Sequence, residues 1–367
     1  MTNPKLFSPL SLRSLDLAHR GWVSPMCQYS CDPASAPGVP TDWHLMHLGQ
    51  FAAGGAALIL TEAAAVSAEG RISPRDAGIY NDEQVTEWRR ITDFVHSTGS
   101  VGTKIGVQLG HAGRKASTYW PFSGRTGSVP SSDFGWESLG PTVEAFDGYA
   151  APRAMSEADI ATVIADFAAA AARSVLAGFD TIELHAAHGY LLHQFQSPLV
   201  NTRIDGWGGD EAGRSRLTLE VIDAVRARIP ETMPLLLRIS ATDWVDGGVD
   251  GDSSVRLARL AREHGVDLID VSTGGAVAGA SIPVGPGYQT RFAAQIRQHA
   301  DMPVGAVGLI STGEQAEHLL ATEQADGVFL ARAALRDPHW WQRAAHGLGV
   351  DLPWAPQYER AAAKGRY

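Results

Sequence analysis

Short apolar runs of β-type composition alternate with amphipathic segments along almost the whole chain. Segments 82–99 and 156–178 repeat their apolar residues with helical spacing. The second begins at Ser156, an expected N-cap because Asp159 follows three residues later, and it ends at Gly178. The runs that we expect to form strands are 21–25, 56–62, 101–110, 179–185, 234–240, 266–272, 302–308 and 325–332.

Eight expected strands with helical segments between them predict an α/β fold, a (β/α)8 TIM barrel. The main alternative is an open doubly wound sheet, which would place a glycine-rich turn after its first strand. The sequence at that point is "SPMCQYS", which contains no glycine, so the barrel is favoured. A barrel of eight units accounts for a chain of 367 residues, and we therefore predict a single domain over residues 1–367.

Three segments fall outside the alternation. Residues 5–20 predict an N-terminal hairpin that closes the floor of the barrel ahead of the first strand. Residues 116–155 are rich in Gly, Ser, Pro and aromatic residues, and they predict a long insertion after the third strand that acts as a lid over a site. Residues 356–367 form a C-terminal tail.

Composition narrows the class of protein. Hydrophobic residues make up 44% of the chain and charged residues 19%, which suits a globular core. A net charge of −10 and a pI of about 5.7 argue against a nucleic-acid partner. No apolar run approaches the roughly 20 residues of a membrane helix, and the N-terminus lacks the pattern of a secretory signal. With only two cysteines, the chain is expected to be a cytoplasmic enzyme.

In such a barrel, site residues project from the carboxyl ends of the strands. Gly308 ends the seventh expected strand and the pair Ala331–Arg332 ends the eighth, at the positions where barrels often bind phosphate. A glycine lets backbone N–H groups approach the anion and Arg332 can grip its oxygens; the alternative is that Arg332 pairs with a carboxylate. Arg238 ends the fifth strand, where it either forms a salt bridge inside the barrel mouth or faces a bound anion.

The segment "IELHAAHGYLLHQFQSP" carries His185, His188 and His193 after the fourth strand. Three interpretations remain open: metal ligands, histidines hydrogen-bonded within a loop, or two imidazole N–H donors that hold one oxygen. The H-x-x-H spacing does not match the i, i+4 pair of H-E-x-x-H, which weakens the metal interpretation. In the third interpretation Tyr190 is the proton donor, because a phenol with a pKa near 10 can protonate a carbanion-like carbon. His193 is expected to be structural.

A series of motifs runs in order across residues 24–338. They are "SPMCQYS", "TEA", "IGVQLGHAGRK", "HAAHGYLLHQFQSPLVNTRIDGWGG", "LLLRISATDW", "PGYQ", "VGLI" and "LAR…LRDP". Together they resemble the Old Yellow Enzyme family, and the cysteine in "PMCQYS" resembles its thermophilic-like branch of FMN-dependent ene-reductases. The resemblance implies a (β/α)8 barrel with FMN at its mouth, in agreement with the strand count.

The resemblance also implies roles for residues. His185 and His188 would hold a carbonyl or nitro oxygen of the substrate, Tyr190 would deliver a proton, and Tyr29 would shape the substrate pocket. Arg360 in the tail would enter the site of a neighbouring subunit. The residues implied to contact FMN are Ser24, Pro25, Met26, Cys27, Ala63, Gln108 and Arg238 at the ring and Gly308, Ala331 and Arg332 at the phosphate. The chain departs from the family at Gln194, where glutamate is usual, and at Ala331, where glycine is usual.

The implied activity is that of an NAD(P)H-dependent flavin oxidoreductase, an ene-reductase or NADPH dehydrogenase. It would reduce the activated C=C bond of α,β-unsaturated carbonyl or nitro compounds by hydride transfer from flavin N5 and proton transfer from Tyr190. NADPH would be the reductant, with NADH as the alternative. We expect small electron-poor alkenes as partners, a homodimer or homotetramer, and no metal, nucleic-acid or membrane partner. The rival functions are a metal-dependent barrel hydrolase and an FMN-binding redox sensor.

Overall fold

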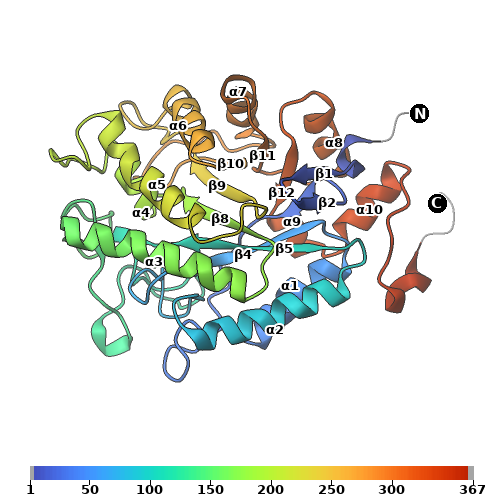
Figure 1. Cartoon of the computed structure of the whole chain (residues 1–367), viewed down its shortest axis with the longest axis horizontal. Coiled ribbons are helices and arrows are strands. Elements are labelled where there is room, and N and C mark those ends of the chain that lie inside the picture. The colour runs from blue at the N-terminus through green and yellow to red at the C-terminus, as the bar shows by residue number, and fades with distance from the viewer. Residues whose placement is uncertain (1–3, 363–367) are drawn as a thin grey trace.

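A closed barrel of eight parallel strands forms the centre of the molecule, which a computed structural model describes over residues 4–362 (Figure 1). The last strand pairs with the first, with Leu330 opposite Val23, and this pairing closes the barrel. All residues of these strands except Lys104 are buried. The barrel strands are β3 (Gly21–Val23), β4 (Leu58–Ala65), β5 (Lys104–Gly110), β8 (Thr181–Ala186), β9 (Leu235–Ser240), β10 (Leu268–Ser272), β11 (Val304–Ala306) and β12 (Gly327–Leu330). The eight predicted strands and the TIM-barrel class are thereby confirmed.

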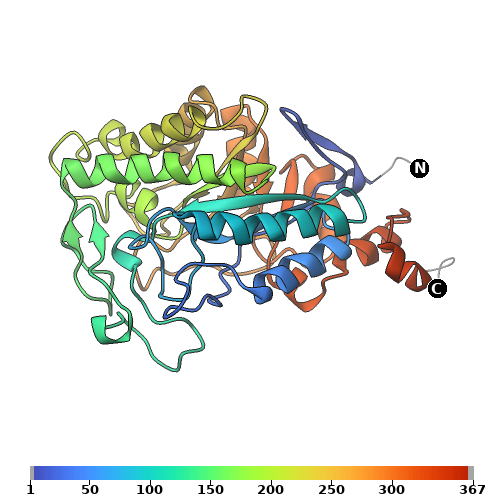
Figure 2. The same cartoon turned by 60° about the horizontal axis from the view of Figure 1, so that its bottom comes forward.

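Helices surround the barrel (Figures 1 and 2). The predicted start of α3 is confirmed: the Ser156 side chain accepts a hydrogen bond from the Asp159 N–H, and the Asp159 carboxylate accepts one from the Ser156 N–H. Two orphan donors of the first turn are satisfied in this way. The helices are α1 (Asp42–Ala53), α2 (Asp82–Thr98), α3 (Glu157–Leu176), α4 (Leu191–Gln196), α5 (Glu211–Arg226), α6 (Gly251–Glu263), α7 (Thr290–Ala300), α8 (Gly313–Ala321), α9 (Arg332–Arg336) and α10 (Trp340–Gly347).

The N-terminal segment closes the amino-terminal end of the barrel, as predicted. After a 3-10 turn, η1 (Lys5–Phe7), the antiparallel strands β1 (Leu10–Leu12) and β2 (Leu15–Leu17) form a hairpin. The leucines of this hairpin pack in one apolar cluster with side chains of the barrel strands, among them Trp22 and Phe329. Burial of these side chains keeps water out of the barrel floor.

The insertion after β5 contains little regular structure. It follows η2 (Gly113–Lys115) and includes η3 (Ser131–Asp133) and the short strands β6 (Leu139–Gly140) and β7 (Arg153–Ala154). Figure 2 shows it as a long excursion on the side of the molecule away from both termini. The predicted extent of the insertion agrees with this arrangement, whereas its role as a lid stays a prediction.

Several strands are shorter than predicted, because runs 21–25, 302–308 and 325–332 form strands only over Gly21–Val23, Val304–Ala306 and Gly327–Leu330. Pairing of β12 with β3 ends at Leu330, and Arg332 is the first residue of α9 rather than the end of a strand. The C-terminal tail forms the 3-10 helix η4 (Pro356–Ala361), where Tyr358 contacts His339 next to α10. Residues 363–367 of the predicted tail lie outside the described residues.

Candidate active site at the mouth of the barrel

The residues expected to contact cofactor and substrate meet at one end of the barrel, with a single exception. Parallel strands that close into a barrel bring all their carboxyl ends to the same rim. The exception is Arg360, which is exposed in η4 beside α10. The residues at the rim are Ser24, Pro25, Met26 and Cys27 after β3, Ala63 in β4, Gln108 in β5, His185 in β8, Arg238 in β9, Gly308 after β11, and Ala331 and Arg332 after β12.

Three rings from the end of β8 and the turn after it form the centre of the site. The ring of His185 lies 5.1 Å from that of His188 and 5.0 Å from that of Tyr190, in edge-to-face arrangements. His185 Nδ1 accepts a hydrogen bond from the Ala187 N–H, so the proton of the neutral ring sits on Nε2. His188 Nε2 lies 2.7 Å from the hydroxyl of Ser272. The structure thus brings together two imidazoles and a phenol.

Burial keeps all three rings in their neutral forms. It lowers the pKa of His185 and of His188 well below the usual value, and the charge of Arg238 adds to both shifts. Burial also raises the pKa of Tyr190 well above the usual value for a phenol. A neutral imidazole can donate one N–H without carrying a charge, and a protonated phenol can act as an acid. The pattern suits two hydrogen-bond donors and a proton donor.

Sequence reasoning missed Lys115, which reaches this site from η2. Its Nζ donates to the carbonyl of His188 at 2.8 Å and to that of Gly275 at 3.2 Å, and it lies 5.2 Å from the centre of the Tyr190 ring. Burial, together with Arg114, lowers the pKa of this ammonium to about 8. The only feature of the sequence that pointed to Lys115 was its place in the motif "LGHAGRK". No local pattern predicts that η2 packs against α4.

Gln194 also ties η2 to the segment that carries the rings. Its Nε2 donates to the carbonyls of Ala112 and Gly189, and its Oε1 accepts from the Arg114 N–H. A glutamate, the usual residue of the family here, has no N–H to donate when it is ionised. Glutamine at position 194 can therefore make two donor hydrogen bonds in this turn that an ionised glutamate could not make.

Arg238 forms the buried salt bridge that was one of its two interpretations. Its Nε lies 3.1 Å from Asp270 Oδ2, and one of its terminal nitrogens donates to the Ser24 hydroxyl at 3.2 Å. Burial raises the pKa of Asp270 to about 6 although the charge of Arg238 acts in the opposite direction. The ion pair fixes the guanidinium at the rim, where it can also face a bound anion.

Cys27 stands beside two buried carboxyl groups. Its Sγ and single oxygens of Glu62 and Asp76 all lie within 4.8 Å of one another. Burial raises the pKa of the thiol well above the usual value, and Asp76 and Glu62 raise it further. Burial and Glu62 raise the pKa of Asp76 to about 8. Within residues 4–362 this is the group of three potential metal ligands that forms, and it includes neither His185 nor His188.

Within residues 4–362, the opposite side of the rim carries backbone N–H groups that have no acceptor. In the described part of the chain, no hydrogen bond is made by the N–H groups of Gly308, Leu309, Ala331 or Arg332. Gly308 has φ +122°, a conformation that favours glycine. The side chain of Arg332 is exposed and forms no ion pair with a carboxylate among residues 4–362, and its expected role at a phosphate stays a prediction.

Tyr29 borders the site from the loop after β3. It adopts a left-handed conformation with φ +52° and its ring lies 6.2 Å from that of Phe122, which belongs to the insertion. Burial raises the pKa of its phenol. The contact places the insertion next to the rim. The expected role of Tyr29 in shaping a substrate pocket stays a prediction.

Comparisons with known proteins agree with this geometry. The chain matches the NADH:flavin oxidoreductase / NADH oxidase family over residues 5–351. It is 44% identical over 356 residues to an NADPH dehydrogenase of Geobacillus sp. (strain WCH70), with 97% of this chain and 98% of the relative covered. It is 42% identical over 357 residues to an NADPH dehydrogenase of Bacillus subtilis (strain 168), with coverage of 97% and 98%. The structure of morphinone reductase in complex with tetrahydroNAD has a TM-score of 0.77 at 26% identity and covers 95% of this chain and 92% of its own.

The closed parallel barrel with its cluster of neutral rings defines a barrel oxidoreductase, an NAD(P)H-dependent flavin enzyme. The chain belongs to the NADH:flavin oxidoreductase / NADH oxidase family, that is, the Old Yellow Enzyme family. Over residues 4–362, none of the helices is both long and apolar enough to cross a membrane.

Proposed function

We propose that the protein is an FMN-dependent ene-reductase that uses NADPH to reduce the activated C=C bond of α,β-unsaturated carbonyl or nitro compounds. The observation that carries the proposal is the meeting of His185, His188 and Tyr190 at the rim that also holds Arg238 and the unpaired N–H groups near Arg332. The side of the rim near Arg332 can bind an anionic cofactor. The side with the three rings can donate hydrogen bonds to a substrate oxygen and a proton to a substrate carbon.

FMN fits the polar groups at this rim. The N–H groups of Gly308, Leu309, Ala331 and Arg332 are available to phosphate oxygens, and the Arg332 guanidinium supplies charge. Arg238 is held by Asp270 where it would face the ring edge that becomes negative on reduction. Ser24, Pro25, Met26, Cys27, Ala63 and Gln108 would line the ring. When it is bound and reduced, the flavin supplies a hydride at N5.

The histidine pair would bind and polarise the substrate. His185 Nε2 carries a proton and is free to donate to a carbonyl or nitro oxygen, while His188 would exchange the Ser272 hydroxyl for the same oxygen. Once His188 has exchanged this contact as the substrate binds, both donors are in place before charge develops on the oxygen. Loss of one such donor typically costs about 3 kcal/mol, on the order of a hundredfold in rate.

Tyr190 would protonate the carbon next to the polarised group. Burial holds its phenol in the protonated form, and a carbanion-like carbon is far more basic than a phenolate. The Tyr190 backbone N–H donates to the Ala187 carbonyl at 3.1 Å and so fixes the start of α4. Because Tyr190, His185 and His188 are all neutral, the protonation would proceed without a charged side chain in contact with the substrate.

A two-step anaerobic experiment tests the proposed function. Protein purified with FMN should be yellow, should bleach on addition of NADPH, and should regain its colour on addition of an enone. A saturated ketone of the same skeleton is the matched control and should leave the flavin reduced. A colourless preparation that cannot be reconstituted with FMN, or equal reoxidation by both ketones, contradicts the proposal. The same titration with NADH decides which nicotinamide is preferred.

We further propose a cytoplasmic location and a homodimer or homotetramer, in which Arg360 would enter the site of a neighbouring subunit. The support is that Arg360 is exposed and lies away from its own rim, so it is free to reach another copy.

A further inference from the structure

The turn that presents the catalytic rings has an unusual backbone conformation. His188 and Gly189 are both left-handed, with φ +58° and +72°. A non-glycine residue in this region is strained by about 1 kcal/mol or more, so neighbouring contacts must hold it. A Cβ on Gly189 would lie 2.0 Å from the carbonyl oxygen of Gly275, so the turn is also pressed against the loop after β10. The position of Tyr190 depends on this turn.

The two halves of the turn are held by different side chains. His188 is fixed through its N–H, which donates to the Ser240 hydroxyl at 2.9 Å, and through its carbonyl, which accepts from Lys115. The Gly189 N–H instead donates to His193 Nδ1 at 2.9 Å. His193 therefore holds the residue directly before Tyr190.

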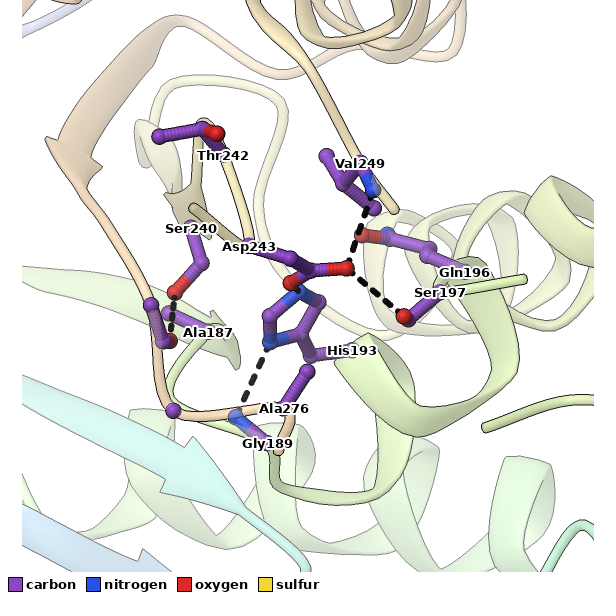
Figure 3. A network of polar contacts seen from close by, with 12 residues as sticks. Ala187, Gly189, His193, Gln196, Ser197, Ser240, Thr242, Asp243, Val249 and Ala276 are labelled. Atoms are coloured by element: carbon purple, nitrogen blue, oxygen red, sulfur yellow. Dashed lines mark hydrogen bonds and ion pairs between the residues drawn. The ribbon is translucent and has the colours of Figure 1, made fainter. Parts of the chain in front are cut away.

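A buried carboxylate stands behind His193 (Figure 3). His193 Nε2 lies 3.0 Å from Asp243 Oδ1, and both side chains are fully buried. The other oxygen, Oδ2, accepts hydrogen bonds from the Ser197 hydroxyl at 2.7 Å and the Val249 N–H at 2.9 Å. Burial opposes ionisation of Asp243, but the contacts with His193, Ser197 and Val249 hold its pKa below the usual value. The carboxylate is therefore ionised at neutral pH.

These contacts select one tautomer of His193. A backbone N–H can only donate, so Nδ1 must be the unprotonated nitrogen that faces Gly189. The ring proton then sits on Nε2, where it faces Asp243 Oδ1. In the other tautomer the Nδ1–H of His193 would face the N–H of Gly189, and the hydrogen bond between them would be lost.

We infer that His193 and Asp243 are positioning residues for Tyr190: the pair holds the acceptor that fixes the left-handed turn at Gly189, and the turn sets the direction of the phenol. The inference rests on the proposed function, because it concerns the proton donor of that reaction. It changes the expected role of His193 from a structural histidine to one that acts on the chemical step through the backbone of Gly189.

Two substitutions at position 193 separate the two contacts. In His193→Asn the side-chain oxygen replaces Nδ1 and can still accept from the Gly189 N–H. In His193→Gln the amide reaches Asp243 but leaves the Gly189 N–H without an acceptor. Anaerobic rapid mixing would measure flavin reduction by NADPH and flavin reoxidation by an enone for each variant. His264→Asn and His264→Gln are the matched controls, since His264 contacts Asp223 at 2.7 Å on the surface between α5 and α6.

We expect His193→Gln to slow reoxidation by the enone about tenfold, the equivalent of one hydrogen bond at ~1.4 kcal/mol, with flavin reduction unchanged. His193→Asn keeps the acceptor for the Gly189 N–H but loses the contact with Asp243, so it should slow reoxidation only about threefold, and the His264 variants should stay close to wild type in both half-reactions. Equal loss in the Asn and Gln variants, or a loss in both half-reactions that follows the fall in melting temperature, contradicts the positioning role.

A milder variant covers the case in which His193→Gln does not fold. Ser197→Ala removes one hydrogen bond from Asp243 and keeps the pair, and it should slow reoxidation about threefold with flavin reduction unchanged. An unchanged ratio of the two half-reactions in Ser197→Ala would count against the inference. Wild-type protein that never reoxidises with an enone would instead contradict the proposed function itself, so the two failures are distinguishable.

Discussion

The ring of Tyr190 stands edge-to-face against the ring of His185, with centroids 5.0 Å apart and planes inclined by 75°. Both rings are neutral, because burial lowers the pKa of the imidazole and raises that of the phenol. With its pKa lowered, the imidazole of His185 does not accept the proton of the Tyr190 phenol. Tyr190 therefore keeps its proton until a more basic carbon is formed beside it.

Substitution of Tyr190 by phenylalanine should separate the two half-reactions. Tyr190→Phe removes the acid and leaves the aromatic packing, so reduction of the enone should slow by about a hundredfold or more. Reduction of the flavin by NADPH should be unchanged, since hydride uptake by the flavin needs no acid from this residue. Stopped-flow absorbance of each half-reaction measures both rates, and equal slowing of the two would show that the proton-donor role is wrong.

The guanidinium of Arg332 should contribute to binding of FMN. Arg332→Ala removes a charge-assisted contact with the phosphate and should weaken FMN binding about tenfold to a hundredfold. Arg336→Ala is the control, because Arg336 is also exposed, lies on the same helix and has no ion pair within the described residues. Fluorescence titration of the apoprotein gives both dissociation constants. Equal affinities for the two variants would place the phosphate elsewhere.

Lys115 should make stability depend on pH above neutrality. Its pKa is lowered from 10.5 to about 8, mainly by burial, so the folded state releases its proton before the unfolded state does. Below about pH 8 the buried ammonium is charged and lowers the free energy of unfolding by its full cost. Between about pH 8 and pH 10.5 the free energy of unfolding should rise, by on the order of 3 kcal/mol relative to Lys115→Met. Urea unfolding of both proteins across this range tests the difference, with Lys104→Met as a control lysine. Parallel pH curves for wild type and Lys115→Met would contradict the prediction.

Arg360 should affect substrate affinity only through another subunit. Figure 1 shows the tail beside α10, on the side of the molecule away from the insertion that borders the rim. If the tail crosses between copies, Arg360→Ala should raise the Michaelis constant for enones, and dilution to monomers should have the same effect. Glu359→Ala on the same 3-10 helix is the control. Unchanged Michaelis constants across several enones would argue that the tail has no part in the site.

Local sequence patterns were sufficient to predict that the eight barrel strands exist, but not where each of them begins and ends. The alternation of apolar runs and amphipathic segments predicted all eight barrel strands, and the Ser156–Asp159 pair predicted the start of α3. The end of the eighth strand was misplaced, because the apolar run continues to Ala331 while pairing with β3 stops at Leu330. Pairing depends on a partner strand about 300 positions away, and a local pattern does not contain it.

The sequence by itself determined the barrel, the family and the side chains that stand at the strand ends, because strand and helix periods and short motifs are local properties. Only the tertiary structure decided the contacts that give those side chains their chemistry. Arg238 meets Asp270 on the neighbouring strand β10, Lys115 reaches the Tyr190 ring from η2, and Asp243 contacts His193. Each contact joins residues far apart in the chain, and burial then shifts their pKa values. Both effects arise only when the barrel closes and water is excluded from its mouth.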